Sequence, residues 1–237
     1  MTLQAEIQGY YDSYSTWYEN ERRAGYYELI NDLETEMVLD AAKGADVLEI
    51  GVGTGLILER VAQVARVAVG IDLSLGMATF SHEEKKLTTA QATADILPFP
   101  DNSFDVVYSM KVLAHVPNID NAISEIHRVL RPDGRAYLEF YNPRSFKFLA
   151  NRIEERIRGS RSVFIRYDTF ADVARLTSKK FTIGKHRGVR IAAPSRHFYT
   201  LPGLGRITRR VDRIIADLPP LSRLGGYLVV ELIPDGR

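Results

Sequence analysis

The sequence predicts an α/β fold, a mostly parallel seven-stranded sheet with helices on both faces. Between about residues 45 and 142, short apolar runs alternate with amphipathic stretches, which is the pattern of βαβ units. A glycine-rich turn follows the first apolar run, and two more strand-like runs lie nearer the C-terminus. We therefore expect a parallel core with added N-terminal and C-terminal cap segments.

The expected elements follow one another closely. After the first strand and its glycine turn, Leu58, Val61 and Ala65 share one face of a helix. Ser74 is the expected N-cap of the helix after the second strand. Residues 131–134, Arg-Pro-Asp-Gly, predict a turn before the fifth strand. In order, the expected strands are 45–50, 67–71, 88–94, 105–110, 135–141, 181–189 and 226–233, and the expected helices are 56–65, 74–86, 119–130, 144–158, 169–176 and 206–218.

The composition is that of an ordinary globular protein of 237 residues, 45% hydrophobic and 26% charged. No apolar run approaches the roughly 18 residues that cross a bilayer. The N-terminus lacks the basic and apolar regions of a secretory signal. The absence of cysteine excludes disulfides, thiolate metal sites and a cysteine nucleophile. These features favour a cytoplasmic protein without a bound metal.

The net charge of +1 conceals an asymmetry. Residues 1–142 carry a formal charge of −11, and residues 143–237 carry +12. A part this basic favours an anionic partner, such as an acidic substrate, a membrane surface or RNA. Alternatively, the two parts neutralise each other within the fold or in a homodimer.

The strongest local signal is the turn after the first strand, Glu-Ile-Gly-Val-Gly-Thr-Gly over residues 49–55. This loop must turn sharply and admit a ligand close to its backbone, and glycine does both without a Cβ clash. Asp72 ends the second strand, 17 residues after Gly55. This is near the roughly 20-residue spacing at which a carboxylate accepts hydrogen bonds from ribose hydroxyls.

The same turn disfavours a dinucleotide. A dinucleotide loop follows the pattern G-x-G-x-x-G, and the third glycine position is Leu56 here. The Glu49 carboxylate would repel a pyrophosphate but attract a cationic ligand without phosphates, such as S-adenosylmethionine with its sulfonium and ammonium groups. An NAD(P)-dependent oxidoreductase is therefore the weaker hypothesis.

Five stretches carry a wider pattern: LEIGVGTG at 48–55, GIDLS at 70–74 with Met77, ADILPF at 94–99, SFDVV at 103–107 and EIHRVLRPDG at 125–134. In this order and spacing, they resemble the class I S-adenosylmethionine-dependent methyltransferases, in the small-molecule group that includes ubiquinone and menaquinone C-methyltransferases. The stretches cover about two-fifths of the chain. The resemblance implies a Rossmann-like class I methyltransferase fold. It also implies S-adenosyl-L-methionine as cofactor and a small-molecule acceptor, hydrophobic or anionic.

The resemblance further implies the cofactor-binding residues. The glycine turn holds the methionine part, Asp72 binds the ribose hydroxyls, and Asp95 and Ile96 contact the adenine. The other residues expected near the cofactor come from the first, second and fourth strands and from an N-terminal lid. The full expected set is Tyr18, Glu49, Gly51, Gly53, Gly55, Asp72, Leu73, Met77, Asp95, Ile96, Ser109 and Met110.

We expect one methyltransferase domain over residues 1–237. Its parts are an N-terminal helical lid (1–40), a cofactor-binding core (41–142) and cap insertions at 144–166 and 191–224. An aromatic stripe is more often packing than chemistry, so we expect the lid to act as a cover with one direct contact, from Tyr18 or Tyr11. The aromatic residues of the lid are Tyr10, Tyr11, Tyr14, Trp17 and Tyr18.

His115 is the candidate catalytic residue. In methyl transfer, the protein contributes mainly proximity and orientation, and a base is needed only if the acceptor must lose a proton. His115 follows the fourth strand, at the sheet edge where α/β proteins bind ligands. It could act as a base or orient the acceptor, and a structural role is the alternative.

Several acceptor classes are disfavoured. Without cysteine, methylation of cytosine C5 through a thiol and arsenite-type thiol chemistry are excluded. The Asn-Pro-Pro-aromatic motif of adenine-specific enzymes is absent after the fourth strand, and no nucleic-acid-binding module is recognisable. A non-catalytic S-adenosylmethionine-binding or scaffolding protein is the remaining alternative.

The C-terminal part also predicts a basic amphipathic helix over 206–218. Such a helix can cap the substrate pocket or lie on an anionic membrane surface. We favour the cap, because the helix lies between the last two expected strands and its apolar face needs cover. Its arginines are Arg206, Arg209, Arg210 and Arg213, and its apolar residues are Ile207, Val211, Ile214 and Leu218.

Overall fold

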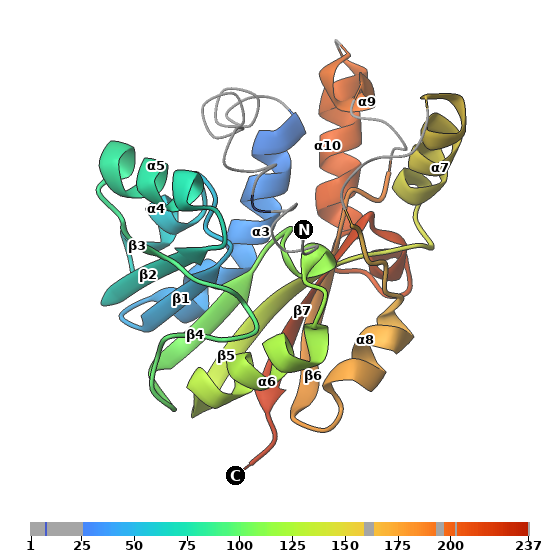
Figure 1. Cartoon of the computed structure of the whole chain (residues 1–237). Coiled ribbons are helices and arrows are strands. Elements are labelled where there is room, and N and C mark those ends of the chain that lie inside the picture. The colour runs from blue at the N-terminus through green and yellow to red at the C-terminus, as the bar shows by residue number, and fades with distance from the viewer. Residues whose placement is uncertain (1–7, 9–25, 159–163, 193–196, 202, 237) are drawn as a thin grey trace.

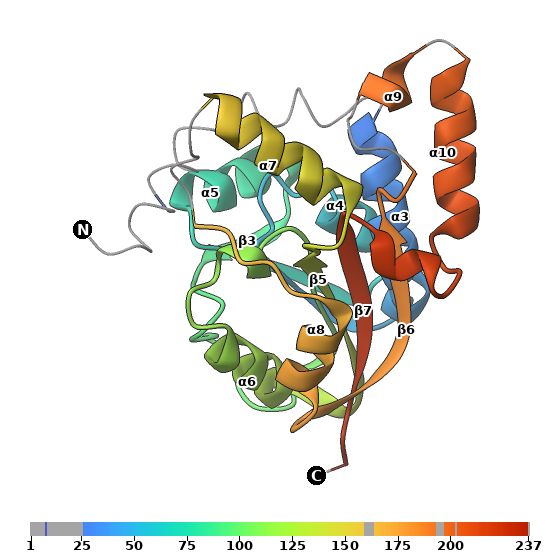
Figure 2. The ribbon, with the colours of Figure 1, turned by 90° about the vertical axis from the view of Figure 1, so that its right-hand side faces the viewer.

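One central sheet organises the chain, with helices on both of its faces (Figures 1 and 2). The computed structural model describes residue 8 and residues 26–158, 164–192, 197–201 and 203–236. Within these residues, no helix is long and apolar enough to cross a membrane.

The sheet has seven strands in the order β3-β2-β1-β4-β5-β7-β6. All neighbouring pairs from β3 to β5 are parallel, and β7 is antiparallel to both β5 and β6. The expected fold class is therefore confirmed. The strands are β1 (Asp46–Ile50), β2 (Val67–Asp72), β3 (Thr88–Gln91), β4 (Phe104–Ser109), β5 (Leu130–Tyr141), β6 (Phe181–Val189) and β7 (Tyr227–Pro234).

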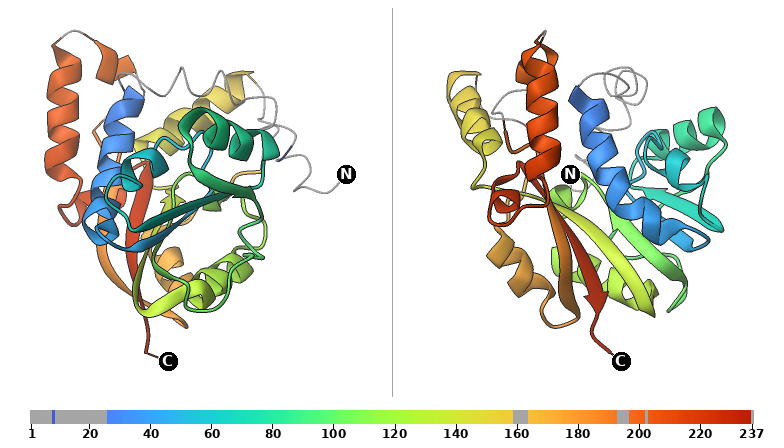
Figure 3. Two further views of the ribbon diagram at one scale, coloured as in Figure 1. Left: turned by 90° about the vertical axis from the view of Figure 1, so that its left-hand side faces the viewer. Right: turned by 180° about the vertical axis from the view of Figure 1, so that it is seen from behind.

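Two apolar clusters bury the faces of the sheet. On one face α6 and α8 pack, and on the other α3 and α4 pack (Figure 3). The α-helices are α3 (Tyr26–Ala42), α4 (Leu58–Val61), α5 (Leu75–Lys85), α6 (Ile119–Val129), α7 (Phe146–Arg158), α8 (Phe170–Thr177), α9 (His197–Thr200) and α10 (Leu204–Ile215), and the short 3-10 helices are η1 (Leu113–His115) and η2 (Leu221–Leu224).

Three expected elements differ in extent. The helix expected over 56–65 is regular only in α4, because the N–H groups of Gln63 and Val64 bond to carbonyls three residues back. The third strand ends at Gln91 instead of residue 94. The turn expected at 131–134 is a bulge inside β5, where the chain advances from Leu130 to Arg135 while β4 advances only two positions.

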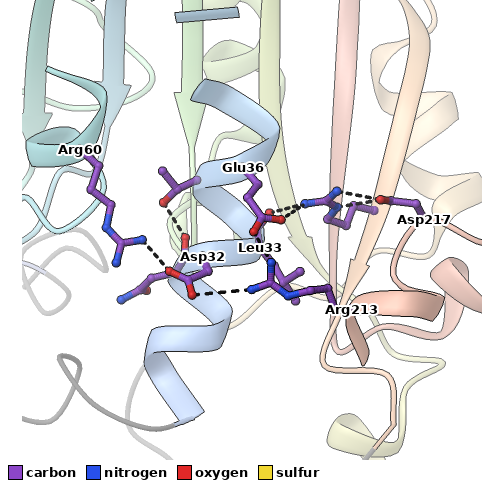
Figure 4. Close-up of polar contacts among 9 residues, drawn as sticks. Asp32, Leu33, Glu36, Arg60, Arg213 and Asp217 are labelled. Atoms are coloured by element: carbon purple, nitrogen blue, oxygen red, sulfur yellow. Dashed lines mark hydrogen bonds and ion pairs between the residues drawn. The ribbon is translucent and has the colours of Figure 1, made fainter. Parts of the chain in front are cut away.

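Ion pairs hold α3 between α4 and α10 (Figure 4). Asp32 on α3 pairs with Arg60 of α4 at 2.8 Å and with Arg213 of α10 at 3.8 Å. Arg213 also pairs with Glu36 at 2.5 Å. The inner face of α3 carries the buried apolar residues Leu29, Ile30, Leu33 and Val38, so the helix joins the core and positions charges on its outer side.

The apolar face of α10 is exposed, so the expectation that this face is covered is wrong. The cap over residues 191–224 stays a prediction. Ile207 and Ile214 are 62% and 60% exposed. The buried positions of the helix are Gly205, Thr208 and Asp212. The helix turns this way because the Asp212 carboxylate accepts hydrogen bonds from inner backbone groups, which a buried charge requires.

Candidate functional site

A pocket opens at the carboxyl ends of β1, β2 and β4, where the strand order changes direction. It encloses about 870 Å³ of empty volume, its open mouth included, which suits a small molecule or a cofactor. We call it the main pocket. It is lined by Ile50, Gly51, Gly53, Ile71, Asp72, Leu73, Met77, Ala92, Thr93, Ala94, Asp95, Met110, Lys111, Val112, His115, Val116 and Pro117.

The glycine turn forms one wall of the main pocket. Gly51 has a φ of +79°, and a Cβ added there would lie 2.0 Å from a methyl group of Val112. Gly53 has a φ of +52°, and a Cβ added there would meet no atom within 4 Å. Glycine at position 51 lets Val112 pack against the turn, and the open space at Gly53 leaves the backbone there accessible to a ligand.

Asp72, at the end of β2, connects two walls of the pocket. Its Oδ2 accepts a hydrogen bond from the Gly53 N–H at 2.8 Å, and its Oδ1 accepts one from the Ser74 N–H at 2.9 Å. Ser74 then caps α5 by accepting the Met77 N–H at 3.1 Å, as the sequence predicts. A carboxylate oxygen can accept more than one hydrogen bond, which is the property that a partner of ribose hydroxyls needs.

Only some of the residues expected around an adenine line the main pocket. Leu73, Met77 and Asp95 line the main pocket, but Ile96 does not and is 73% exposed. Sequence reasoning missed a further part of the main pocket's wall, which consists of three small residues in the loop after β3. These are Ala92, Thr93 and Ala94.

Glu49 lies beneath the glycine turn, in a smaller hollow that adjoins the main pocket. It is 3% exposed and accepts a hydrogen bond from the Tyr108 hydroxyl at 2.9 Å. Burial raises the pKa of Glu49 to about 8, although the Tyr108 hydrogen bond opposes this rise. We call this hollow the side pocket. Its lining is Asn31, Glu49, Gly51, Val52, Gly53, Thr54, Leu56, Ile57, Met110 and Lys111.

Two other expected residues have structural roles in the described chain. Ser109 is buried, and its hydroxyl donates to the Ile50 carbonyl at 2.9 Å, which joins β4 to β1. Gly55 lies outside both pockets, and a Cβ added there would lie 2.5 Å from a methyl group of Leu87. Met110, in contrast, borders both pockets.

Lys111 is a site residue that sequence reasoning missed. It lies two residues after the end of β4, has a φ of +63° and lines both pockets. Its ammonium donates a hydrogen bond to the fully buried carboxylate of Glu34 on α3. No local pattern connects two residues 77 positions apart, so the sequence alone could not pair them.

Glu139 is a buried acid that sequence reasoning did not single out, and it lines neither pocket. It is fully buried on β5, and neither of its carboxylate oxygens has a hydrogen-bond partner among the described residues. Burial raises its pKa well above the ordinary value, and the nearby Glu34 carboxylate adds to the rise, while Lys111 opposes it. The signal was present in the sequence, since one acid interrupts the apolar run of residues 136–141.

His115 lies in η1 and lines the main pocket. Its Nδ1 is 2.8 Å from the carbonyl oxygen of Phe164, which only accepts, so Nδ1 carries the proton and donates. In the neutral ring, Nε2 is then the nitrogen with the lone pair. Burial lowers the pKa of His115, so the ring is neutral near pH 7 and has the form that a proton acceptor needs.

The aromatic residues of the expected lid, Tyr18 and Tyr11 included, lie outside the described residues. Among the residues that the structure does describe, no group of His, Asp or Glu is arranged to hold a metal ion. Within the described residues, the site consists of the glycine turn, the carboxyl ends of β1, β2 and β4, and η1.

The residues of both pockets fit S-adenosylmethionine. The Thr54 hydroxyl is buried in the side pocket without a hydrogen-bond partner in the described chain, which suits a polar group of a ligand. The open space at Gly53 lies at both pockets, and the Glu49 carboxyl beside it would stabilise a cation. Asp72 offers acceptor oxygens to a diol.

Comparisons with known proteins relate part of the chain to methyltransferases. Residues 48–138 match the family described as a methyltransferase domain. The demethylmenaquinone methyltransferase of Tropheryma whipplei is 36% identical over 113 residues, which are 46% of this chain and 47% of that protein. The chain spans about half the length of the curated relatives it matches.

Solved structures share the fold over nearly the whole chain. An S-adenosylmethionine-dependent methyltransferase from Thermotoga maritima has a TM-score of 0.69 and 19% identity, covering 95% of this chain and 98% of that one. The cyclase SpnF also has a TM-score of 0.69, with 20% identity, covering 100% of this chain and 98% of that one. At these identities the likeness shows the fold, and the two neighbours carry different activities in their names.

Proposed function

We propose that this chain, of which residues 48–138 match a methyltransferase domain, is a class I S-adenosylmethionine-dependent methyltransferase that transfers a methyl group from S-adenosyl-L-methionine to a small-molecule acceptor. The observation that carries the proposal is the link between Asp72 and Gly53. It brings a carboxylate that could accept hydrogen bonds from ribose hydroxyls and an open glycine turn to the same pocket.

We propose that the two pockets together hold the cofactor. The side pocket, with Glu49 and Thr54, would take the charged methionine part, and Asp72 would accept hydrogen bonds from the ribose hydroxyls. Leu73, Met77 and Asp95 would border the adenine in the main pocket. The residues expected from the sequence and now found away from the pockets, Gly55, Ile96 and Ser109, would support this site from outside.

When bound, the cofactor supplies a methyl group on a sulfonium, which is already a strong electrophile. The chain must therefore mainly align the acceptor with that carbon and keep water out. Met110, Val112 and Val116 give the wall near β4 an apolar surface suited to this task. Neutral His115 would take a proton at Nε2 if the acceptor loses one, or would orient the acceptor through the same atom.

We propose a hydrophobic or anionic acceptor. The apolar residues after β4, Val112, Val116 and Pro117, favour a partly hydrophobic molecule. The name of the Tropheryma whipplei relative specifies an acceptor of that kind. The charge of +12 over residues 143–237 favours an anionic group on the acceptor or on a surface that presents it. A cytoplasmic location and a homodimer remain predictions.

The test is calorimetry followed by turnover. We expect S-adenosylmethionine and its demethylated product to bind in the micromolar range, and NADH not to bind. Turnover is then followed by mass spectrometry, as formation of S-adenosylhomocysteine with candidate hydrophobic and anionic acceptors. Absence of S-adenosylmethionine binding by the folded protein would overturn the proposal.

Two alternatives predict different results. A non-catalytic binding or scaffolding protein would bind S-adenosylmethionine without turnover with any acceptor. The name of SpnF, a cyclase, shows that proteins of this fold can carry out other reactions. An NAD(P)-dependent oxidoreductase would bind NADH. Leu56 at the third glycine position and Glu49 at the floor of the side pocket both disfavour it.

A further inference from the structure

Two helices present apolar side chains to solvent at the carboxyl edge of the sheet. The helix α7 follows the end of β5, and α10 leads through η2 into the antiparallel β7, so both lie toward the edge at which the main pocket opens (Figures 1 and 2). Their exposed apolar residues are Phe146, Leu149, Ile153 and Ile157 on α7, and Leu204, Ile207, Val211 and Ile214 on α10, with Leu218 just beyond it.

The orientation of α10 follows from one buried carboxylate. Asp212 accepts hydrogen bonds from the backbone N–H groups of Ile191 at 2.9 Å and Ala192 at 2.7 Å, and from the Tyr199 hydroxyl. A buried carboxylate with three donors is costly to move, because water would have to replace all three. With Asp212 inside, the helical spacing places Ile207 and Ile214 on the outer side.

The orientation of α7 follows from a buried cation. The ammonium of Lys147 lies 4.7 Å from the ring centre of Tyr141 and 4.5 Å from that of Tyr227, between two aromatic faces. Lys147 is only 7% exposed, whereas Ile157 is 77% exposed. Both helices are therefore anchored through a polar residue and turn their apolar residues outward, the reverse of an ordinary amphipathic helix.

Arginines flank both apolar rows. Arg152 and Arg156 are exposed on α7, and Arg206 and Arg210 are exposed on α10. The one acidic residue of α10, Asp212, is buried, so every exposed charged residue of that helix is an arginine. Cores of protein interfaces are depleted of charge, whereas helices that lie in a membrane interface combine apolar side chains with flanking Lys and Arg.

We infer that α7 and α10 together form a docking surface for an anionic lipid membrane. The apolar residues enter the boundary between headgroups and acyl chains, and the arginines lie among anionic headgroups. The contact is peripheral, since no described helix can cross a bilayer. The inference goes beyond methyl transfer and does not depend on it, although a hydrophobic acceptor would reach the main pocket from the same side.

Vesicle co-sedimentation tests the surface directly. We expect the protein to bind phosphatidylcholine vesicles that contain about 30 mol% phosphatidylserine, and to bind pure phosphatidylcholine at least about tenfold more weakly. Raising the salt from about 0.1 M to about 0.5 M should weaken binding to anionic vesicles by about tenfold or more.

Paired variants locate the surface. Ile207→Ser with Ile214→Ser, and separately Leu149→Ser with Ile153→Ser, should each weaken vesicle binding about tenfold or more. The matched control is Val64→Ser with Val67→Ser, two exposed apolar residues at the amino edge of the sheet, which should bind as the parent does. Since all six side chains are exposed, thermal unfolding and S-adenosylmethionine affinity should stay unchanged.

A charge-matched pair tests the arginines. Arg206→Glu with Arg210→Glu should abolish binding to anionic vesicles, whereas Lys179→Glu with Lys180→Glu, the same change in net charge before β6, should not. The inference is overturned if the parent protein binds neither vesicle at low salt, or if the controls lose binding as fully as the test pairs. It is also overturned if the test pairs break a dimer of this chain in solution and the parent does not bind vesicles.

Discussion

The Asp72 carboxylate accepts a hydrogen bond from the backbone N–H of Gly53 over 2.8 Å. The bond joins the end of β2 to the turn after β1, so one carboxylate both shapes the glycine turn and faces the main pocket. The second carboxylate oxygen accepts the N–H of Ser74, the N-cap of α5. Asp72 is thus positioned by backbone groups on two sides, in the wall of the main pocket.

The first prediction concerns Asp72. Asp72→Ala should weaken S-adenosylmethionine binding by about 1.5–3 kcal/mol, because charge-assisted hydrogen bonds to the ribose are lost. Asp72→Asn should fall between that variant and the parent, since one carbonyl oxygen remains as an acceptor. Calorimetry measures the affinities, and Asp133→Asn, an exposed acid on β5, is the control. Unchanged affinity in a folded Asp72→Ala protein would contradict the ribose assignment.

The second prediction concerns the pH dependence of cofactor affinity. The pKa of Glu49 is about 8 in the free protein, so Glu49 is largely protonated at pH 6.5. A bound cation favours the ionised carboxylate, so binding should release a proton. S-adenosylmethionine should therefore bind more tightly as the pH rises from about 6.5 to about 8, by at most about tenfold per pH unit.

Glu49→Gln is the matched control for this pH dependence. It keeps the shape of the side chain but cannot ionise, so its affinity should show only the titration of the ligand itself. Calorimetry in two buffers of different ionisation enthalpy measures the proton released by each protein. Equal proton release by the parent and Glu49→Gln would show that another group is responsible.

The third prediction concerns His115. His115→Ala should lower turnover far more than S-adenosylmethionine affinity, if the acceptor is a hydroxyl or an acidic carbon. His115→Gln can still donate to the Phe164 carbonyl but cannot accept a proton, so it separates acid–base chemistry from support of the loop. The measurement is turnover against pH. If both variants turn over as fast as the parent, His115 has a packing role and no role in the reaction.

The fourth prediction concerns Glu139. Its pKa is raised in the folded protein, so folding stability should decrease as the pH rises above the ordinary carboxyl value of 4.5. Glu139→Gln removes that ionisation and should stabilise the free protein at pH 8 by about 1–3 kcal/mol, with little effect at pH 5. Denaturant unfolding at the two pH values measures the difference.

Glu231 provides the contrasting control for Glu139. Its carboxylate accepts hydrogen bonds from the Tyr137 hydroxyl at 3.2 Å and the Lys185 N–H at 3.0 Å. Glu231→Gln should therefore destabilise the protein at pH 8, since charge-assisted bonds are weakened. If both variants destabilise equally at pH 8, Glu139 is ionised and paired in the native protein, contrary to the prediction.

Local patterns of the sequence were sufficient for the sheet and for much of the site. Short apolar runs predicted all seven strands, and the runs are clearest in β1, β4 and β7, because a strand buried on both faces needs consecutive apolar residues. Gly51, Gly53 and Asp72 were identified because a tight turn and a strand end require particular residues at short spacing. The sequence thus determined the fold class and the glycine turn that lines both pockets.

Only the tertiary structure decided which residues meet across the fold. The pairing of Lys111 with Glu34 joins two elements 77 positions apart, and the exposure of Ile207 depends on the donors around Asp212. The amphipathic pattern of α10 was visible in the sequence, but the rule that apolar residues face inward gave the wrong side. A buried carboxylate must keep its hydrogen bonds, and that requirement outweighed the burial of the isoleucines.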